Sequence, residues 1–143
     1  MADLTPIATA VYSRLKSDST GAAVRAALGA QAASVVRLKD IRQPAPVPVA
    51  PFVAFRAMPA PLVSRGVHQA MFEWRIYTEA DDDFTATTLA GLMDAAYAAG
   101  PIQYTTGGVV GLVEATSLDG DAYDAALGLS VRAWRLSVLI GDA

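Results

Sequence analysis

The stretch MFEWRIYTEADDDFTATTLAGLMDAAYAA, residues 71–99, joins a strand pattern directly to a helix pattern. Apolar and polar side chains first alternate with the two-residue period of a strand that buries one face. Three aspartates at 81–83 then stand where carboxylates accept the free backbone N–H groups of a helix start and favour its positive dipole end. Apolar residues follow at the steps of three and four that mark one helix face: Leu89, Leu92, Met93 and Ala96. This unit predicts a strand that leads into a helix, and it contains no catalytic pattern.

Length and composition narrow the class of protein. The chain has 143 residues, of which 53% are hydrophobic, so we expect it to fold as a single domain over residues 1–143. Eleven basic and fourteen acidic residues give a formal charge of −3 without a basic run, which argues against a surface that wraps nucleic acid. The absence of cysteine excludes disulfides, thiolate catalysis and cysteine-ligated zinc. No apolar run reaches the ~20 residues of a membrane span and no secretory signal is visible, so we expect a soluble, intracellular chain.

The remaining sequence predicts further helices and strands. Thr5 followed by Pro6 is typical of a helix start, and this helix is expected to end near Ser17. A second helix is expected over residues 20–28, where Gly29 stops it. We expect strands over residues 34–41, 52–57, 67–77, 102–104, 109–117 and 127–140.

The proline-rich residues 43–51, QPAPVPVAP, predict an extended arm that runs ordered over the surface. Their backbone has few N–H groups for a strand ladder, because four of the nine residues are prolines. Taken together, the order of elements predicts an α+β fold, in which an antiparallel or mixed sheet is packed on one side by two main helices. Trp74 and Trp134 are expected in its core, on two different strands.

Side chains that carry chemistry are few. His68 is the only histidine, and its place at the mouth of a hairpin predicts an exposed strand end rather than a catalytic base. Glu73 and Glu114 each alternate with apolar residues, which favours outward, solvated positions over an acid–base pair. The arginines at 75, 132 and 135 are interpreted as solvated, although arginine is also enriched at protein interfaces. The aspartates lack the ligand spacing of calcium loops, so no metal site is predicted. Together with the scarcity of other reactive side chains, the sequence predicts no catalytic residue and no cofactor.

Four segments follow one another in a recognisable order. They are an amphipathic helix, LTPIATAVYSRLKS; a proline-rich arm that enters an aromatic strand, PVAPFVAFRAM; a strand, FEWRIYTEADD, that leads into a helix, FTATTLAGLMDAAYAA; and a polar loop with a closing strand, DGDAYDAALGLSVRAWRLSVLI. In this order the chain resembles the tail terminator, or tail completion, proteins of long-tailed phages and related gene transfer agents. The resemblance covers nearly the whole chain, and its four segments keep the same order.

The resemblance implies a structural virion protein without catalytic residues. Family members form a ring, usually of six copies, on the head-proximal end of the tail tube, where the ring stops tube polymerisation and offers a surface for joining the head. The implied partners are therefore further copies of the chain, the tail tube protein and a head-closure or connector protein. DNA would pass through the lumen without specific binding, which a negative net charge permits. The implied location is the head–tail junction of a virion or virus-like particle, after assembly in the bacterial cytoplasm.

Two predicted loops, 58–69 and 118–126, are expected to contact other subunits or partners. The candidate interface residues in them are Arg65, His68, Asp121 and Tyr123. Plain hairpin connections would explain each of these residues equally well.

Other interpretations of the sequence remain open. A head–tail connector or head-closure protein would also form a ring in the same assembly. A small ligand-binding or enzymatic α+β domain would need a pocket with convergent polar groups, and the scarcity of histidine, cysteine and paired carboxylates argues against it. A dimeric α+β module with an unrelated role is the third alternative.

Overall fold

The computed structural model describes residues 5–29, 34–41, 48–58, 62–64, 67–80, 82–103, 110–120 and 122–141. Its helices are α1 (Thr5–Lys16), the 3-10 turn η1 (Ser19–Gly21), α2 (Ala22–Ala27), α3 (Leu38–Ile41) and α4 (Asp83–Ala98). Its strands are β1 (Val35–Arg37), β2 (Phe52–Met58), β3 (Leu62–Ser64), β4 (Val67–Thr78), β5 (Ile102–Gln103), β6 (Val110–Leu118), β7 (Ala122–Asp124) and β8 (Leu129–Gly141).

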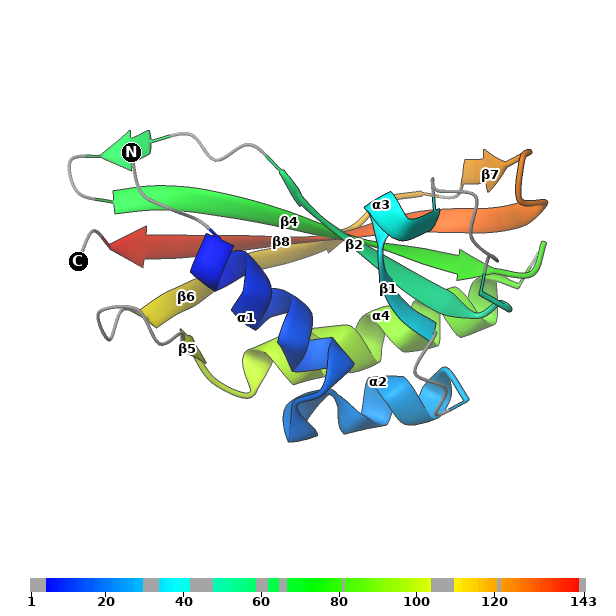
Figure 1. Cartoon of the computed structure of the whole chain (residues 1–143), viewed down its shortest axis with the longest axis horizontal. Helices are drawn as coiled ribbons and strands as arrows, with labels where there is room; N and C mark the ends of the chain where they lie inside the picture. Colours follow the sequence, from blue (N-terminus) through cyan, green and yellow to red (C-terminus); the bar gives the residue numbers. More distant parts are fainter. Residues whose placement is uncertain are drawn as a thin grey trace.

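The strands form one mixed sheet with α1, α2 and α4 packed on one of its faces (Figure 1). The strand order is β1-β2-β4-β8-β6-β5, with β3 added to β4 and β7 added to β8. Of the described strand pairs, β1 with β2 is parallel and the others are antiparallel. The predicted α+β fold with helices on one side of the sheet is therefore confirmed. Among the described residues, the opposite sheet face, named the open face below, carries the short α3 near β1 and β2.

The centre of the sheet is the long ladder between β4 and β8, in which Trp74 lies directly opposite Trp134. Both indoles are buried on the helix-covered face, as predicted. Tyr97 of α4 lies between the tryptophans and α1. Its hydroxyl accepts a hydrogen bond from Trp74 Nε1 at 3.0 Å and donates one to the Val11 carbonyl at 2.6 Å. Burial raises the pKa of this phenol, so it stays neutral and fixes α1, α4 and β4 to one another.

Arg14 of α1 satisfies the carbonyl groups at the C-terminal end of α4. Its guanidinium donates to the Gly100 carbonyl at 2.9 Å and the Pro101 carbonyl at 3.0 Å. The last carbonyls of a helix have no partner within the helix, and a buried cation suits the negative end of the dipole. A residue far away in the sequence thus completes the helix end at Gly100 and Pro101.

The start of α4 agrees with the prediction that the aspartates at 81–83 stand at a helix start. Asp82 is the N-cap, and its carboxylate accepts from the Thr85 backbone N–H at 3.1 Å and from the Thr85 hydroxyl at 2.7 Å. Hydrogen bonds from the Thr85 hydroxyl and backbone hold the pKa of Asp82 below its usual value. Asp83 opens the helix and pairs with Arg132 at 2.9 Å, while Asp81 lies outside the described residues.

Several local expectations differ from the structure. The strand expected over 34–41 is limited to β1, and the chain then turns into α3 because Leu38 and Ile41 pack on the open face against β2. The expected helix over 20–28 begins as η1 before α2, and Gly29, with a φ of +90°, follows its end as predicted. The helix α1 starts at Thr5 itself.

The two loops singled out in the sequence contain strands. The 58–69 segment includes β3 and the start of β4, and the 118–126 segment includes β7, which pairs with β8. Both expectations of an irregular loop are wrong at these positions, because the pairing continues beyond the hairpin ends. Of the proline-rich arm, only residues 48–51 belong to the described part of the chain.

Candidate functional site

The open face of β4 carries Glu73, which is the centre of the candidate site. The sheet's alternation points Phe72, Trp74 and Ile76 toward the helices and Glu73 away from them, as predicted. The expected solvated position is nevertheless wrong, because Glu73 is only 1% exposed. Neighbouring strands and their long side chains cover it, which a strand pattern alone does not reveal.

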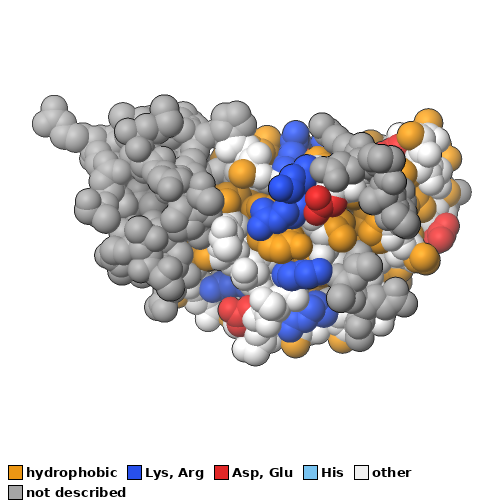
Figure 2. Space-filling view, in the orientation of Figure 1, with side chains coloured by type: hydrophobic (Ala, Val, Ile, Leu, Met, Phe, Trp, Pro, Cys, Tyr) orange, Lys and Arg blue, Asp and Glu red, His pale blue; other side chains and the backbone are white. Residues whose placement is uncertain are grey.

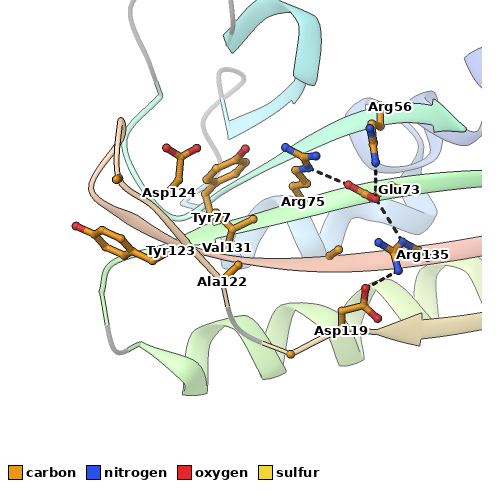
Figure 3. A pocket seen from close by; sticks show the side chains of 13 residues that line it. Arg56, Glu73, Arg75, Tyr77, Asp119, Ala122, Tyr123, Asp124, Val131 and Arg135 are labelled. Carbon is orange, nitrogen blue, oxygen red and sulfur yellow. Dashed lines mark hydrogen bonds and ion pairs between the residues drawn. The ribbon is translucent and has the colours of Figure 1, made fainter.

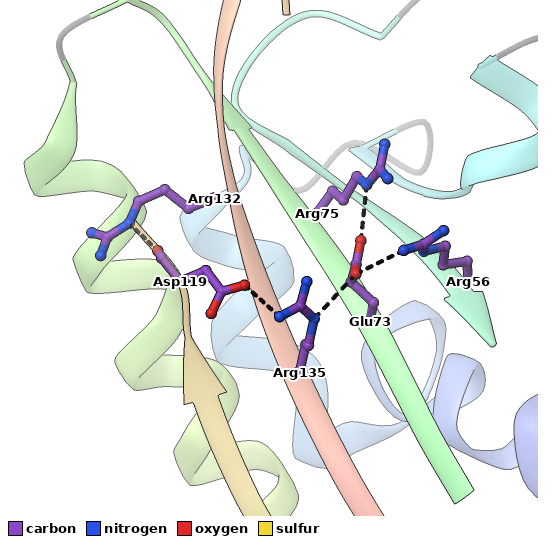
Figure 4. Close-up of polar contacts among 6 residues, drawn as sticks. All are labelled: Arg56, Glu73, Arg75, Asp119, Arg132 and Arg135. Carbon is purple, nitrogen blue, oxygen red and sulfur yellow. Dashed lines mark hydrogen bonds and ion pairs between the residues drawn. The ribbon is translucent and has the colours of Figure 1, made fainter. Parts of the chain in front are cut away.

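Three arginines surround the Glu73 carboxylate (Figure 4). Arg75, two residues along β4, donates from Nε to Oε1 at 2.8 Å. Arg56 on β2 donates from Nη2 to Oε2 at 3.1 Å, and Arg135 on β8 donates from Nε to the same oxygen at 3.3 Å. Arg135 also pairs through Nη1 with the carboxylate of Asp119. The cluster therefore links β2, β4, β8 and the end of β6 through charge-assisted hydrogen bonds.

The arginines determine the ionisation of Glu73. Burial by itself would raise the pKa of this carboxyl, but hydrogen bonds from Arg75 and Arg56, together with their charges, outweigh it and hold the pKa below its usual value. In return, Glu73 raises the pKa of Arg75 despite the burial of that guanidinium. Glu73 is thus a fixed anion and not a proton carrier near neutral pH.

The cluster lines one wall of a hollow of about 550 Å³ on the open face (Figure 3). Asp124 adds a third carboxylate to the lining, so the three guanidinium groups face three acids. The remaining lining residues are small, apolar or aromatic: Tyr77, Gly120, Ala122, Tyr123, Ala125, Val131 and Ala133. Arg56, Arg75 and Arg135 keep 39%, 28% and 35% of their side chains exposed. Within the described part of the chain, Arg56 Nε is a buried donor without an acceptor. Guanidinium donors beside apolar walls suit a carboxylate that is attached to an apolar group.

The predicted interface residues are only partly brought to this hollow. Tyr123 lies on β7, is 63% exposed and lines the hollow. The backbone of His68 pairs with Leu62 of β3 and Ile140 of β8, toward the other end of β4, so the structure does not bring His68 and Tyr123 together. Arg65 and Asp121 lie outside the described residues.

The sequence did not predict that Arg56 and Asp119 belong to this site, or that Glu73 and Arg135 act together in it. One feature of the sequence did point to the cluster: Glu73 and Arg75 lie two residues apart in one strand, so their side chains must face the same side of the sheet. The register that places Arg56 and Arg135 beside them depends on long-range pairing, which the sequence does not specify. The expectation that Arg75, Arg132 and Arg135 are merely solvated is wrong, because each of them holds a carboxylate.

A second charged surface lies on the helix-covered side, where basic side chains gather near the middle of the view (Figure 2). The guanidinium of Arg37 lies 4.3 Å from the ring centroid of Tyr12, and Lys16 donates to the Val35 carbonyl at 2.9 Å. Eight of the eleven basic residues fall in positions 1–65, and eleven of the fourteen acidic residues fall in 66–143. Basic residues are therefore concentrated in the first part of the sequence and acidic residues in the second.

Comparisons with known proteins add no family assignment. The sequence matches no protein-family model and no curated protein at a significant level. Among the described residues, no cluster of histidine, cysteine, aspartate and glutamate is arranged to hold a metal ion. In the same part of the chain, every helix is too short or too polar to cross a bilayer.

Proposed function

We propose that this chain is a structural subunit of a phage tail or of a related gene transfer agent. In this proposal several copies, six by the family resemblance, form a ring on the head-proximal end of the tail tube. The ring stops addition of further tube protein and receives the head-closure or connector protein. The proposed location is the head–tail junction of the particle.

The observation that carries the proposal is the contrast between the two faces of the sheet. A closed ring is built from heterologous contacts, in which one surface of a subunit meets a different surface of the next. Here one face is covered by α1, α2 and α4, and the other holds a preformed hollow with an arginine–carboxylate cluster. Two unlike surfaces on opposite sides of one sheet suit such contacts. The order of elements along the chain, which carries the family resemblance, supports the same proposal.

The charge of the chain fits a lumen through which DNA slides. A formal charge of −3 disfavours tight adhesion of phosphate backbones. The basic side chains of the helix-covered surface are engaged locally: Arg37 stacks on Tyr12, and Arg25 donates to the Leu15 carbonyl at 2.9 Å. The proposal therefore includes passage of DNA without specific binding.

Deletion of the gene in a producing strain tests this role. A terminator is required to stop the tube, so particles without it should show abnormally long tubes and heads without tails. Tails of normal length that fail to join heads would instead favour a head-closure ring protein. Normal particles would reject both roles.

The hollow on the open face favours one alternative of a different class, a small ligand-binding domain. Its guanidinium groups would accept a small organic acid. A thermal-shift screen with mono- and dicarboxylates distinguishes this function, because a ligand that binds only the folded state raises the melting temperature with its concentration. A structural ring subunit should show no such dependence.

A further inference from the structure

The strands β1 and β7 form opposite edges of the sheet at one of its ends. The strand order at this end is β1-β2-β4-β8-β7, because β7 pairs with the first residues of β8 and β6 pairs with the later ones. The helices α1 and α3 contact β1. The first turn of α4 lies beside β7, and the two line a second hollow of about 450 Å³. The two edges therefore present different elements and different side chains.

The edge at β7 exposes two aromatic rings. Phe84, in the first turn of α4, is 82% exposed, and Tyr123 of β7 is 63% exposed. The ring of Tyr123 points outward, away from the arginine cluster (Figure 3). Asp83, the neighbour of Phe84, lines the second hollow together with Tyr123. Large apolar side chains that are exposed side by side, with a polar rim, mark contact surfaces of soluble proteins.

The same edge carries an excess of negative charge. Glu79, Asp82 and Asp83 bring three carboxylates, and Arg132, which pairs with Asp83 at 2.9 Å, returns one positive charge. Glu79 is exposed and has no ion-pair partner among the described residues. The larger hollow does not alter this balance, because its three guanidinium groups face three carboxylates. We name Glu79, Asp82, Asp83, Phe84 and Tyr123 the acidic edge.

The edge at β1 carries an excess of positive charge. Lys16, Arg37 and Lys39 bring three cations, and the exposed Asp40 returns one negative charge. The half-buried Arg37 holds its guanidinium 4.3 Å from the ring centroid of Tyr12. A planar guanidinium that stacks on one ring can take a second ring on its other face. We name Lys16, Arg37 and Lys39 the basic edge.

Side chains, and not strand pairing, are available for a contact at the basic edge. The Val35 carbonyl of β1 accepts hydrogen bonds from Lys16 Nζ at 2.9 Å and from the Tyr12 hydroxyl at 3.3 Å. Because α1 already occupies this backbone group, a neighbouring copy meets the cationic side chains here and does not extend the sheet.

We propose that the acidic edge of one copy docks against the basic edge of the next copy. This inference rests on the proposed ring and names a contact between its subunits. Each copy offers one edge of each sign, at opposite sides of its sheet, so the contact is heterologous and leaves one edge of each copy free for a further subunit. Phe84 and Tyr123 supply buried area against Arg37, while Glu79 and Lys39 set the orientation and the rate of encounter.

Light scattering of the full chain at low and high salt tests the contact. Phe84→Ala removes an aromatic anchor and should weaken self-association about thirty-fold, the factor for a hot-spot residue worth about 2 kcal/mol. Lys39→Glu reverses one charge of the basic edge and should weaken association about ten-fold or more at low salt, with a smaller effect at high salt. Circular dichroism of every variant confirms that the fold is kept.

Ala95→Glu is the matched control for an added negative charge. Ala95 is an exposed residue of α4 and lies about 18 Å along the helix from Phe84, at a rise of about 1.5 Å per residue. It belongs to neither edge, so Ala95→Glu should leave association unchanged.

Mixing the two defective variants gives the decisive result. Phe84→Ala retains the basic edge and Lys39→Glu retains the acidic edge, so one intact contact forms between them. The mixture should therefore yield dimers, whereas each variant alone stays monomeric. As a direct readout, separately purified Ala122→Cys and Asp40→Cys chains should form a mixed disulfide, since both changes keep the rings and the cations and the chain has no native cysteine. An Ala95→Cys chain mixed with Asp40→Cys should not.

The outcomes separate this inference from the proposed function. Rings that persist in both Phe84→Ala and Lys39→Glu overturn the contact between the edges and leave the ring function standing. Equal losses of association in Ala95→Glu and Lys39→Glu would assign the effect to net charge and also overturn the inference. A wild-type chain that remains monomeric at high concentration, and forms no 122–40 mixed disulfide on added tail tube protein, contradicts both.

Discussion

Glu73 on β4 and Arg135 on β8 occupy directly opposed positions of the antiparallel ladder, and Arg135 Nε donates to the Glu73 carboxylate at 3.3 Å. The pair sits on the open face, directly behind the neighbouring Trp74 and Trp134 of the helix-covered face. One register therefore fixes both the aromatic core and the charged cluster. A slip of the ladder by one residue would exchange the two faces and bury the arginines among the helices.

Replacement of Glu73 by Gln should destabilise the protein by about 3 kcal/mol at pH 7, because it leaves three partly buried guanidinium groups without their anion. Urea unfolding measures the change. Glu79→Gln, at an exposed position, serves as the control and should change stability by less than about 0.5 kcal/mol. Equal effects of the two variants would show that the cluster does not stabilise the fold.

The same carboxyl predicts a pH dependence with a definite sign. The folded-state pKa of Glu73 is lowered, so its contribution is complete above the unfolded-state pKa, about 4.3, and is lost as pH falls through the folded-state value. Wild type should therefore lose more unfolding free energy than Glu73→Gln between about pH 5 and pH 3. Parallel stability profiles of the two proteins over this range would contradict the assignment.

Arg14→Ala should lower the free energy of unfolding by about 2 kcal/mol, since it removes the guanidinium that satisfies the Gly100 and Pro101 carbonyls. Arg25→Ala is the matched control, because it removes the hydrogen bond from Arg25 to the Leu15 carbonyl and should cost about half as much. Hydrogen exchange gives a local check. The last turn of α4 should lose protection in the Arg14 variant and keep it in the Arg25 variant.

Tyr97→Phe should cost about 2 kcal/mol, because the buried Trp74 indole N–H loses its acceptor and the Val11 carbonyl loses a donor. Tyr123→Phe removes the same atom from an exposed ring and should be nearly neutral. Thermal and urea unfolding of the two variants provide the comparison. A neutral Tyr97 variant would mean that this hydroxyl does not join α1, α4 and β4.

Two glycines should respond to alanine in opposite directions. A Cβ at Gly21 would lie 2.1 Å from the Arg14 carbonyl oxygen, so Gly21→Ala must push η1 away from α1 and should cost about 2 kcal/mol or more. A Cβ at Gly91, inside α4, meets nothing within 4 Å, so Gly91→Ala should stabilise the protein by about 0.5–1 kcal/mol. Stabilisation by both changes would show that α1 and η1 pack less closely.

The parts of the fold that depend on local pattern were predictable from sequence. Residues 71–99 indicated β4 and α4 because alternation, an aspartate cap and helical spacing are all contained in one segment. The short strands β3 and β7 were not predicted, since each is defined by the partner strand and not by its own residues. For the same reason Leu38 and Ile41 entered a helical turn instead of extending β1.

The sequence identified some residues of the candidate site but not how they are arranged in space. The sequence placed Glu73 and Arg75 on one strand parity and named Tyr123, which does line the hollow. It gave no means of locating Arg56 beside Glu73, because the register of β2 against β4 pairs residues that are seventeen positions apart. Burial of Glu73 follows from that pairing, so the solvated position inferred from alternation alone was wrong.

The mass of the wild-type chain in solution, measured by light scattering and followed by negative-stain imaging of the same fraction, tests the proposed ring most directly. We predict closed rings of about six copies, formed by the purified chain or on addition of tail tube protein, and independent of nucleotide and metal. A chain that stays monomeric or dimeric at high concentration and does not assemble on tail tube protein would contradict the account.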